Sequence, residues 1–162
     1  MFIRKTVLKD LPQIEALYRR ARQFMRLNGN GGQWGDSYPE RQTLLDDIAR
    51  GVSYVCVDGG NILAVFAFIK EPDATYKIIE NGAWLNDEPY FVIHRFTTGG
   101  ARQGTGAFCL EWCFSQCPNI RIDTHKNNKP MLGLINKTGF TYCGIIYTHD
   151  GTPRLAFQKK IK

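Results

Sequence analysis

The chain has 162 residues, of which 43% are hydrophobic and 22% charged. This composition suits one globular domain over residues 1–162 and excludes a disordered or coiled-coil protein. Its net charge is +6, but the cations are scattered, so a polyanionic small ligand explains the excess as well as nucleic acid does. No apolar run is long enough to cross a membrane and the first residues are unlike a signal peptide, so we expect a cytoplasmic protein without a membrane or nucleic-acid partner.

The chain opens with the features of a strand followed by a helix. Apolar Ile3 and Val7 alternate with polar residues, as in a half-buried strand. Apolar residues then recur at helical spacing over residues 11–26. Asp10 and Gln13 stand where the acceptor and the third residue of a capping box would, with a proline between them. We therefore predict that Asp10 caps this helix.

Residues 28–39 are rich in glycine and hold two aromatic side chains, Trp34 and Tyr38. Glycine at four of these positions prevents a regular element, so we predict a loop. Aromatic residues in such loops often line binding pockets. For Trp34, covering the core is an equal alternative. A second helix is predicted over residues 40–50.

The middle of the chain predicts a hairpin and then an irregular segment. Two apolar strands, at residues 52–57 and 62–69, flank the sequence Asp-Gly-Gly-Asn, which is a strong signal for a hairpin turn. Residues 71–89 are irregular and rich in acidic side chains. A solvated loop is the simpler interpretation of this segment, although acidic side chains near a site could hold an amine.

The most informative stretch is an apolar strand at residues 91–98 that leads through a glycine-rich turn into a helix. Glycine lets the backbone pass close to a ligand, and the first turn of a helix carries unpaired N–H groups and the positive end of the helix dipole. Such a turn is suited to phosphate, although a tight turn also needs glycine for structural reasons alone. The turn reads Gly99-Gly100-Ala101-Arg102-Gln103-Gly104-Thr105-Gly106-Ala107.

The five cysteines, an odd number, indicate reduced thiols. Cys109, Cys113 and Cys117 recur every four residues along the predicted helix and lack the paired spacing of a zinc site. We interpret them as small buried hydrophobic residues and expect no metal.

The rest of the chain predicts a strand, a short helix and a closing hairpin. Residues 120–125 alternate as a strand does, and Asn128 is expected to cap the helix. Strands at residues 140–147 and 154–160 are joined around an Asp-Gly turn. The whole order of elements predicts an α/β (α+β) fold, with a mixed sheet and helices on both faces.

This order of elements resembles the GNAT superfamily of acyl-CoA-dependent N-acetyltransferases over essentially the whole chain. The turn from Gln103 to Ala107 is similar to the family's pyrophosphate turn, and the segment from Asn128 to Phe140 is similar to its asparagine-to-Gly-Phe segment. The resemblance implies a mostly antiparallel sheet whose fourth and fifth strands splay apart to admit acetyl-CoA (coenzyme A). It implies that the cofactor is bound by Phe96, Thr97, Thr98, Arg102, Gln103, Gly104, Thr105, Gly106, Ala107, Asn128 and Met131.

Two positions depart from the family's pattern. Ala101 stands where the turn usually has glutamine or arginine. Ile135 stands where the family often has the tyrosine that gives a proton to the departing sulfur. A thiol has a pKa of about 8.5 and leaves tolerably as a thiolate, so the loss of that tyrosine need not abolish transfer.

Acetyl transfer to an amine needs a base that takes the amine's proton. His94 on the central strand, and Asp123 and His125 two residues apart on the next, are the candidates, and they would gather near the splay if the strands are neighbours. The structural alternatives are an ion pair of Asp123 with Arg95 or Arg121 and a sheet-edge role for His125.

The sequence does not identify the acceptor. We expect direct attack on the thioester by a primary amine of a small molecule or peptide, and we leave a homodimer open. One alternative is a non-catalytic CoA-binding regulatory module, motivated by Ile135. A second is a basic nucleic-acid binder, motivated only by the net charge. The residues expected to shape the acceptor pocket are Trp34, Tyr38, Trp84 and Tyr147.

Overall fold

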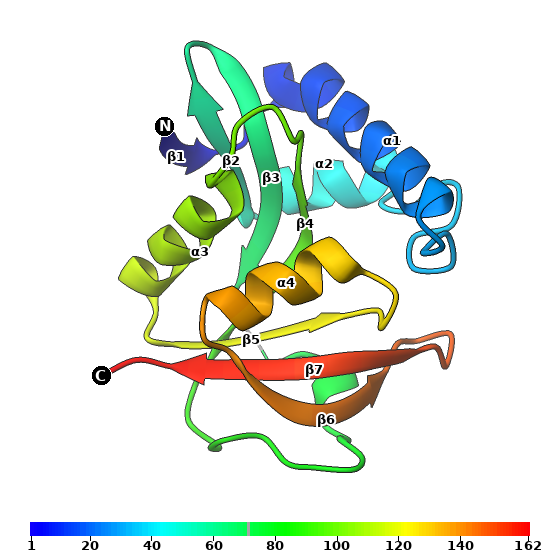
Figure 1. Ribbon diagram of the computed structural model, residues 1–162. Helices are drawn as coiled ribbons and strands as arrows, with labels where there is room; N and C mark the ends of the chain where they lie inside the picture. The colour runs from blue at the N-terminus through cyan, green and yellow to red at the C-terminus, as the bar shows by residue number, and fades with distance from the viewer. Residues whose placement is uncertain (71) are drawn as a thin grey trace.

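The computed structural model describes residues 1–70 and 72–162, which form one seven-stranded sheet with helices on both faces (Figure 1). The strand order is β1-β2-β3-β4-β5-β7-β6, and each neighbouring pair is antiparallel except β4 and β5. The predicted mixed, mostly antiparallel sheet is confirmed. Glu71, which opens the predicted acidic loop, lies outside the described residues. The strands are β1 (Phe2–Lys5), β2 (Ser53–Asp58), β3 (Asn61–Ile69), β4 (Phe91–Thr98), β5 (Asn119–Thr124), β6 (Thr141–Tyr147) and β7 (Pro153–Lys160).

Two helices, α1 (Leu11–Leu27) and α2 (Arg41–Ala49), cover one face of the N-terminal half of the sheet (Figure 1). Ile14 and Leu17 on α1 are fully buried and belong to one apolar cluster with Val55 of β2. The helical spacing of these residues thus places one stripe of α1 on the sheet. No helix among the described residues is both long and apolar enough to cross a bilayer.

The opposite face is covered by α3 (Thr105–Gln116) and α4 (Lys129–Lys137). Cys109 and Cys113 on α3 are buried against the sheet, and burial raises the pKa of both thiols. All five cysteines are free and buried, which confirms that they serve as small hydrophobic residues. Within the described part of the chain, no three His, Cys, Asp or Glu side chains gather as metal ligands would.

The irregular segment before β4 covers the C-terminal half of the first face. Arg121 of β5 is buried there, with its guanidinium 4.2 Å from the ring centroid of Trp84 and 3.9 Å from that of Tyr90. It also donates to the carbonyl of Asn86 at 2.7 Å. Arg121 therefore holds the segment to the sheet and does not form the ion pair with Asp123 that was the structural alternative.

The predicted capping box before α1 is wrong. A short 3₁₀ turn, Leu8–Asp10, precedes the helix, and the Asp10 carboxylate makes no cap hydrogen bond to α1. It accepts instead from the N–H of Val7 at 2.9 Å and from both terminal nitrogens of Arg4 at 2.6 and 2.9 Å. A buried carboxylate gains more from a cation and an amide than from a helix end alone.

The two predicted hairpins are confirmed. β2 and β3 pair in antiparallel register down to Asp58 with Asn61, and β6 pairs with β7 from Tyr147 with Pro153. Both turns contain glycine with a positive φ, which is the conformation that these tight connections require.

Candidate active site

β4 separates from β5 in the middle of the sheet, and this separation opens the site. The two parallel strands pair at Phe91 with Ile120 and at Val92 with Arg121. Beyond Val92, the edge of β4 that faces β5 has no strand partner among the described residues. Those N–H and C=O groups of this edge that have no partner within the protein are therefore available to a ligand.

A β-bulge on β4 lies beside this opening. Its register with β3 shifts, so that Arg95 and Phe96 together lie opposite one residue of β3. Arg95 has a φ of 54°, which non-glycine residues rarely adopt. Its carbonyl accepts from the Tyr18 hydroxyl at 2.7 Å, and its guanidinium makes two bonds of 2.8 Å to Asp47, not to Asp123. These contacts hold the bulge and fix Phe96 at the open edge.

The glycine turn leads from β4 into α3 and exposes main-chain amides. Gly104 has a φ of 83° directly before α3, where a residue with a Cβ would be strained. A Cβ on Gly106 would lie 2.9 Å from Leu134 Cδ2, so glycine lets α3 approach α4 closely. Thr105 Oγ1 donates to the carbonyl of Arg102 at 2.8 Å and fixes the turn. The first amides of a helix lack intrahelical acceptors and bind phosphate readily.

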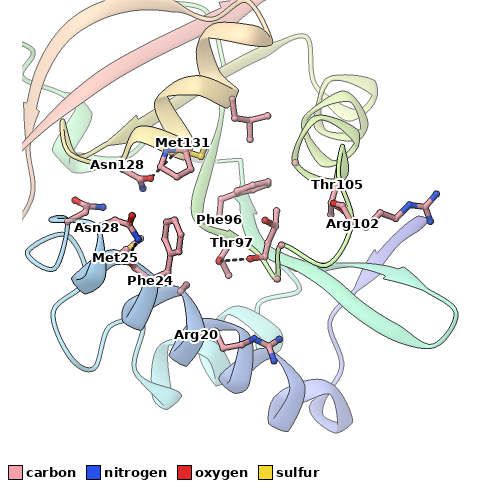
Figure 2. Close-up of a pocket in the computed structure, with 18 of the residues that line it drawn as sticks. Arg20, Phe24, Met25, Asn28, Phe96, Thr97, Arg102, Thr105, Asn128 and Met131 are labelled. Atoms are coloured by element: carbon pink, nitrogen blue, oxygen red, sulfur yellow. Dashed lines mark hydrogen bonds between the residues drawn. The ribbon is translucent and has the colours of Figure 1, made fainter.

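The glycine turn forms one wall of a cleft of about 570 Å³, here called the glycine-turn cleft. Phe24 from α1, Phe96 from β4 and Met131 from α4 point into it (Figure 2). No aspartate or glutamate is among the described residues that line it. Gln103 and Ala107 belong to the turn but are not lining residues. The expected cofactor contacts that do line it are Phe96, Thr97, Thr98, Arg102, Gly104, Thr105, Gly106, Asn128 and Met131.

Two arginines at the glycine-turn cleft differ in their pairing. Arg102 forms an ion pair with Asp58 of β2, and Figure 2 shows its side chain directed away from the cleft. Arg20 of α1 lines the cleft and has no ion pair among the described residues. Its Nη2 would lie 3.7 Å from a Cβ on Gly99, at the start of the turn. Arg20 is one of four arginines on α1, and the sequence alone does not indicate which of them lines the cleft.

A second cleft, of about 620 Å³, adjoins the first. It lies among the loop after α1, β4, β5 and the β6–β7 turn, and we call it the aspartate cleft after Asp73, Asp123 and Asp150, which line it. Because the clefts share part of their lining, a group bound in one can reach a group bound in the other. The residues that line both are Phe96, Asn128 and Met131.

Asn128 is held at this junction by hydrogen bonds. Its Oδ1 accepts from the N–H of Met131 at 3.2 Å, so it caps α4 as predicted, and its Nδ2 donates to Gln33 Oε1 at 2.9 Å. Gln33 Oε1 also accepts from Asn30 Nδ2 at 2.8 Å. Gln33 therefore ties the glycine-rich loop to the junction, a role that nothing in the local sequence indicated.

His94 and Asp73 form a pair in the aspartate cleft. His94 Nε2 lies 2.6 Å from Asp73 Oδ2, and Asp73 Oδ1 accepts from the N–H and hydroxyl of Thr75 at 2.8 and 2.6 Å. Burial by itself would raise the pKa of Asp73, but the hydrogen bonds from His94 and Thr75 outweigh it and hold that pKa well below its usual range. The ionised carboxylate can only accept, so His94 carries its proton on Nε2 and, when neutral, presents a lone pair on Nδ1.

Of the other two base candidates, Asp123 lines the aspartate cleft and His125 does not. Asp123 lines the aspartate cleft together with His94, and its Oδ1 accepts from the Tyr76 hydroxyl at 2.6 Å. His125 is not among the described lining residues of either cleft. Its Nδ1 accepts from the N–H of Asn127 at 3.1 Å, and burial, followed by nearby cations, lowers its pKa.

Of the four aromatic residues expected in the acceptor pocket, two line the aspartate cleft and two do not. Trp34 and Tyr38 line the aspartate cleft, with ring centroids 6.3 Å apart, and Trp34 also packs on the core cluster under α1. Trp84 and Tyr147 are not among the described lining residues. Trp84 packs over Arg121, and the Tyr147 hydroxyl donates to Glu80 at 2.9 Å.

Solved structures that match this fold include acetyltransferases. A GNAT-family acetyltransferase from Streptococcus agalactiae matches with a TM-score of 0.90 at 32% identity, over 99% of this chain and 95% of that chain. A putative acetyltransferase from Staphylococcus aureus Mu50 matches with a TM-score of 0.75 at 26% identity over 100% of both chains. A putative acetyltransferase from Salmonella typhimurium, solved with its cofactor acetyl-CoA, shares the fold at 15% identity, with a TM-score of 0.67 over 99% and 94% of the two chains. A scan of family profiles and a search of curated proteins find no match.

Proposed function

Because the chain belongs to the GNAT family of acetyltransferases, we propose that it transfers an acetyl group from acetyl-CoA to a primary amine. The observation that carries this proposal is the meeting of two clefts of different chemistry at Phe96, Asn128 and Met131. One is lined by the glycine turn and Arg20 and, among the described residues, by no carboxylate, so it suits a polyanion. The other carries three aspartates, which suit an amine, together with Arg95 and Arg154. When bound, acetyl-CoA supplies an acetyl group already activated as a thioester.

In this proposal the glycine-turn cleft binds the cofactor. The free amides of residues 104–107 hold the diphosphate, and Arg20 adds positive charge to the same cleft, near Gly99. The open edge of β4 bonds the pantetheine amides as a neighbouring strand would. Phe24 and Phe96 contact the apolar part of the arm, and Asn128 closes the opposite side.

The amine must lose a proton before it attacks, and we assign His94 as the base. Asp73 fixes the ring orientation and stabilises the imidazolium that forms, while Nδ1 accepts the proton. Asp123 lines the same cleft and attracts the ammonium form of the acceptor before the proton is removed.

The departing sulfur needs no tyrosine in this proposal. Ile135, at the position where the family often has one, is fully buried in the core. The shared lining residues, Phe96, Asn128 and Met131, carry no ionisable group. The thiol therefore leaves as a thiolate, which its pKa of about 8.5 permits.

The test is release of free thiol from acetyl-CoA in the presence of a panel of primary amines. The wild type should turn over at least one amine, whereas Gly104→Glu should bind CoA about 100-fold more weakly because it adds strain and negative charge at the turn. Gly60→Glu is the matched control, since Gly60 has a φ of 81° and, like Gly104, open space around it. No turnover above the Gly104→Glu variant would overturn the proposal.

A non-catalytic CoA-binding module is the alternative, and the buried Ile135 favours it. It predicts that calorimetry detects tight acetyl-CoA binding by the wild type while no amine is acetylated. Measurable transfer to any amine removes this alternative.

A further inference from the structure

Arg154, at the start of β7, lines the aspartate cleft and has no ion pair among the described residues. Its side chain is buried, with a relative exposure of 7% for the residue. The guanidinium donates to the carbonyls of Pro153 and Gln33, both at 3.1 Å. Arg95 in the same cleft is, by contrast, fully paired with Asp47. A guanidinium has five N–H donors, so Arg154 retains donors and a charge that a ligand can satisfy.

Asp123 lies next to Arg154 on the same face of the sheet. Asp123 pairs in register with Ala156 of β7, so Arg154 is its diagonal neighbour across the two strands. Neither side chain forms an ion pair in the described structure, although both line the cleft. Burial lowers the pKa of Arg154, which Asp123 and Asp150 oppose, and an arginine remains charged at neutral pH. Arg154 and Asp123 thus present a cation and an anion side by side, in a cleft that Asp73 and Asp150 also line.

The pair is also close to the junction of the clefts. Arg154 Nη2 bonds the carbonyl of Gln33, and the Gln33 side chain bonds Asn128, which lines both clefts. Hydrogen bonds through Gln33 thus connect Arg154 to the junction. Because Arg154 and Asp123 are diagonal neighbours on adjacent strands, they suit an acceptor whose anionic group and amine are separated by few atoms.

We propose that the acceptor is a free α-amino acid, whose carboxylate binds Arg154 and whose amine lies toward Asp123. This inference rests on the proposed acetyl transfer and names its substrate class. Arginine binds a carboxylate through two parallel N–H bonds, which fixes orientation as well as position. The amino-acid side chain faces Trp34 and Tyr38 across the cleft. A polypeptide N-terminus lacks a carboxylate on the same carbon and does not satisfy Arg154.

The test compares three forms of one acceptor in the wild-type protein: an α-amino acid, its carboxamide and the decarboxylated amine. The set is built on whichever of the twenty amino acids is acetylated fastest. We expect kcat/KM for the carboxamide and the amine to be at least about 30-fold lower, because Arg154 would be left without its partner. Calorimetric titration of the protein–CoA complex with the same three compounds measures binding without turnover, and the amino acid should bind most tightly.

Variants then assign the effect to Arg154. Arg154→Gln should raise KM for the amino acid at least about 30-fold and leave the decarboxylated amine within about 3-fold, while Arg154→Lys should fall between. Lys126→Gln is the control, since Lys126 is exposed and outside the described lining of both clefts. Equal use of all three acceptor forms overturns this inference and leaves acetyl transfer standing. No transfer to any amine overturns the proposed function, and absence of amino-acid binding in the titration then overturns this inference separately.

Discussion

The two clefts depend on different kinds of chemical group. The glycine-turn cleft depends on the main chain: a left-handed glycine, the first amides of α3 and the open edge of β4. The aspartate cleft depends on side chains that pair across elements, such as His94 with Asp73 and Asp123 with Tyr76. A backbone site keeps its chemistry when side chains change, whereas a side-chain site is altered by single substitutions. In the proposed reaction, the backbone site would hold the cofactor and the side-chain site would hold the acceptor.

The largest effect should come from His94, the proposed base in the aspartate cleft. His94→Gln should lower kcat by about 100- to 1,000-fold, because a positioned general base contributes that much. CoA affinity should change less than about 2-fold, since the glycine-turn cleft is untouched. Steady-state kinetics and calorimetry together check both values.

His149→Gln serves as the control for this change. His149 lines the same cleft but is exposed in the β6–β7 turn. If the two histidine variants lose kcat equally, or if His94→Gln also weakens CoA binding, the assignment of catalysis and CoA binding to different clefts is contradicted.

A smaller loss is expected when the partner of His94 changes. Asp73→Asn should lower kcat about 10-fold, because a neutral amide still orients the ring but no longer stabilises the imidazolium. Asp36→Asn, at an exposed loop aspartate, should leave kcat unchanged. An unchanged kcat in Asp73→Asn would contradict the role given to Asp73.

In the glycine-turn cleft, the side chains should matter less than the backbone. Arg20→Gln should weaken CoA binding about 3- to 10-fold, because it removes one exposed cation near a polyanion, and salt should diminish the difference. Arg19→Gln, the adjacent exposed arginine outside the described lining of either cleft, is the matched control. A 100-fold loss in Arg20→Gln would show that this cleft depends on side chains after all.

The smallest kinetic effect should come from a site remote from both clefts. Arg4, through its hydrogen bonds, holds the pKa of Asp10 below its ordinary value, and burial opposes this only in part. The pair therefore stabilises the fold above about pH 4 and loses that contribution as the pH falls below it. Asp10→Asn should lower the free energy of unfolding by about 1–3 kcal/mol at pH 7.

Denaturant unfolding at several pH values checks this prediction. The difference between wild type and Asp10→Asn should close in acid, and the kinetic constants of the two proteins should agree at neutral pH. A difference that persists below pH 3 would mean that packing, and not the ionised carboxylate, carries the effect.

The parts of the molecule with local signals were predictable. The hairpin turns, the cap formed by Asn128 and the turn around Gly104 are each set by a few consecutive residues. The order of these elements was enough to predict the mixed sheet. Asp10 shows the limit of local signals, because Arg4 on a neighbouring strand competed with the helix for its carboxylate.

The aspartate cleft was only partly predictable, because its residues are distant in sequence. Asp73 lies 21 residues before His94 in an irregular segment, and its pairing follows from tertiary packing alone. Gln33 and Arg154 are 121 positions apart and meet only in the folded chain. His125 was expected beside Asp123 because of its alternation, but the chain leaves the strand at Thr124 and turns toward α4.

The short ladder between β4 and β5 has a consequence for the energetics of the whole sheet. Two β4–β5 residue pairs join the two halves of the sheet. A ligand that forms hydrogen bonds along β4 would therefore extend the sheet as well as occupy a cleft. Amide protons on that edge should exchange with deuterium quickly in the free protein and slowly once acetyl-CoA is bound. Binding of acetyl-CoA would thus lower the frequency with which β4 and β5 separate further.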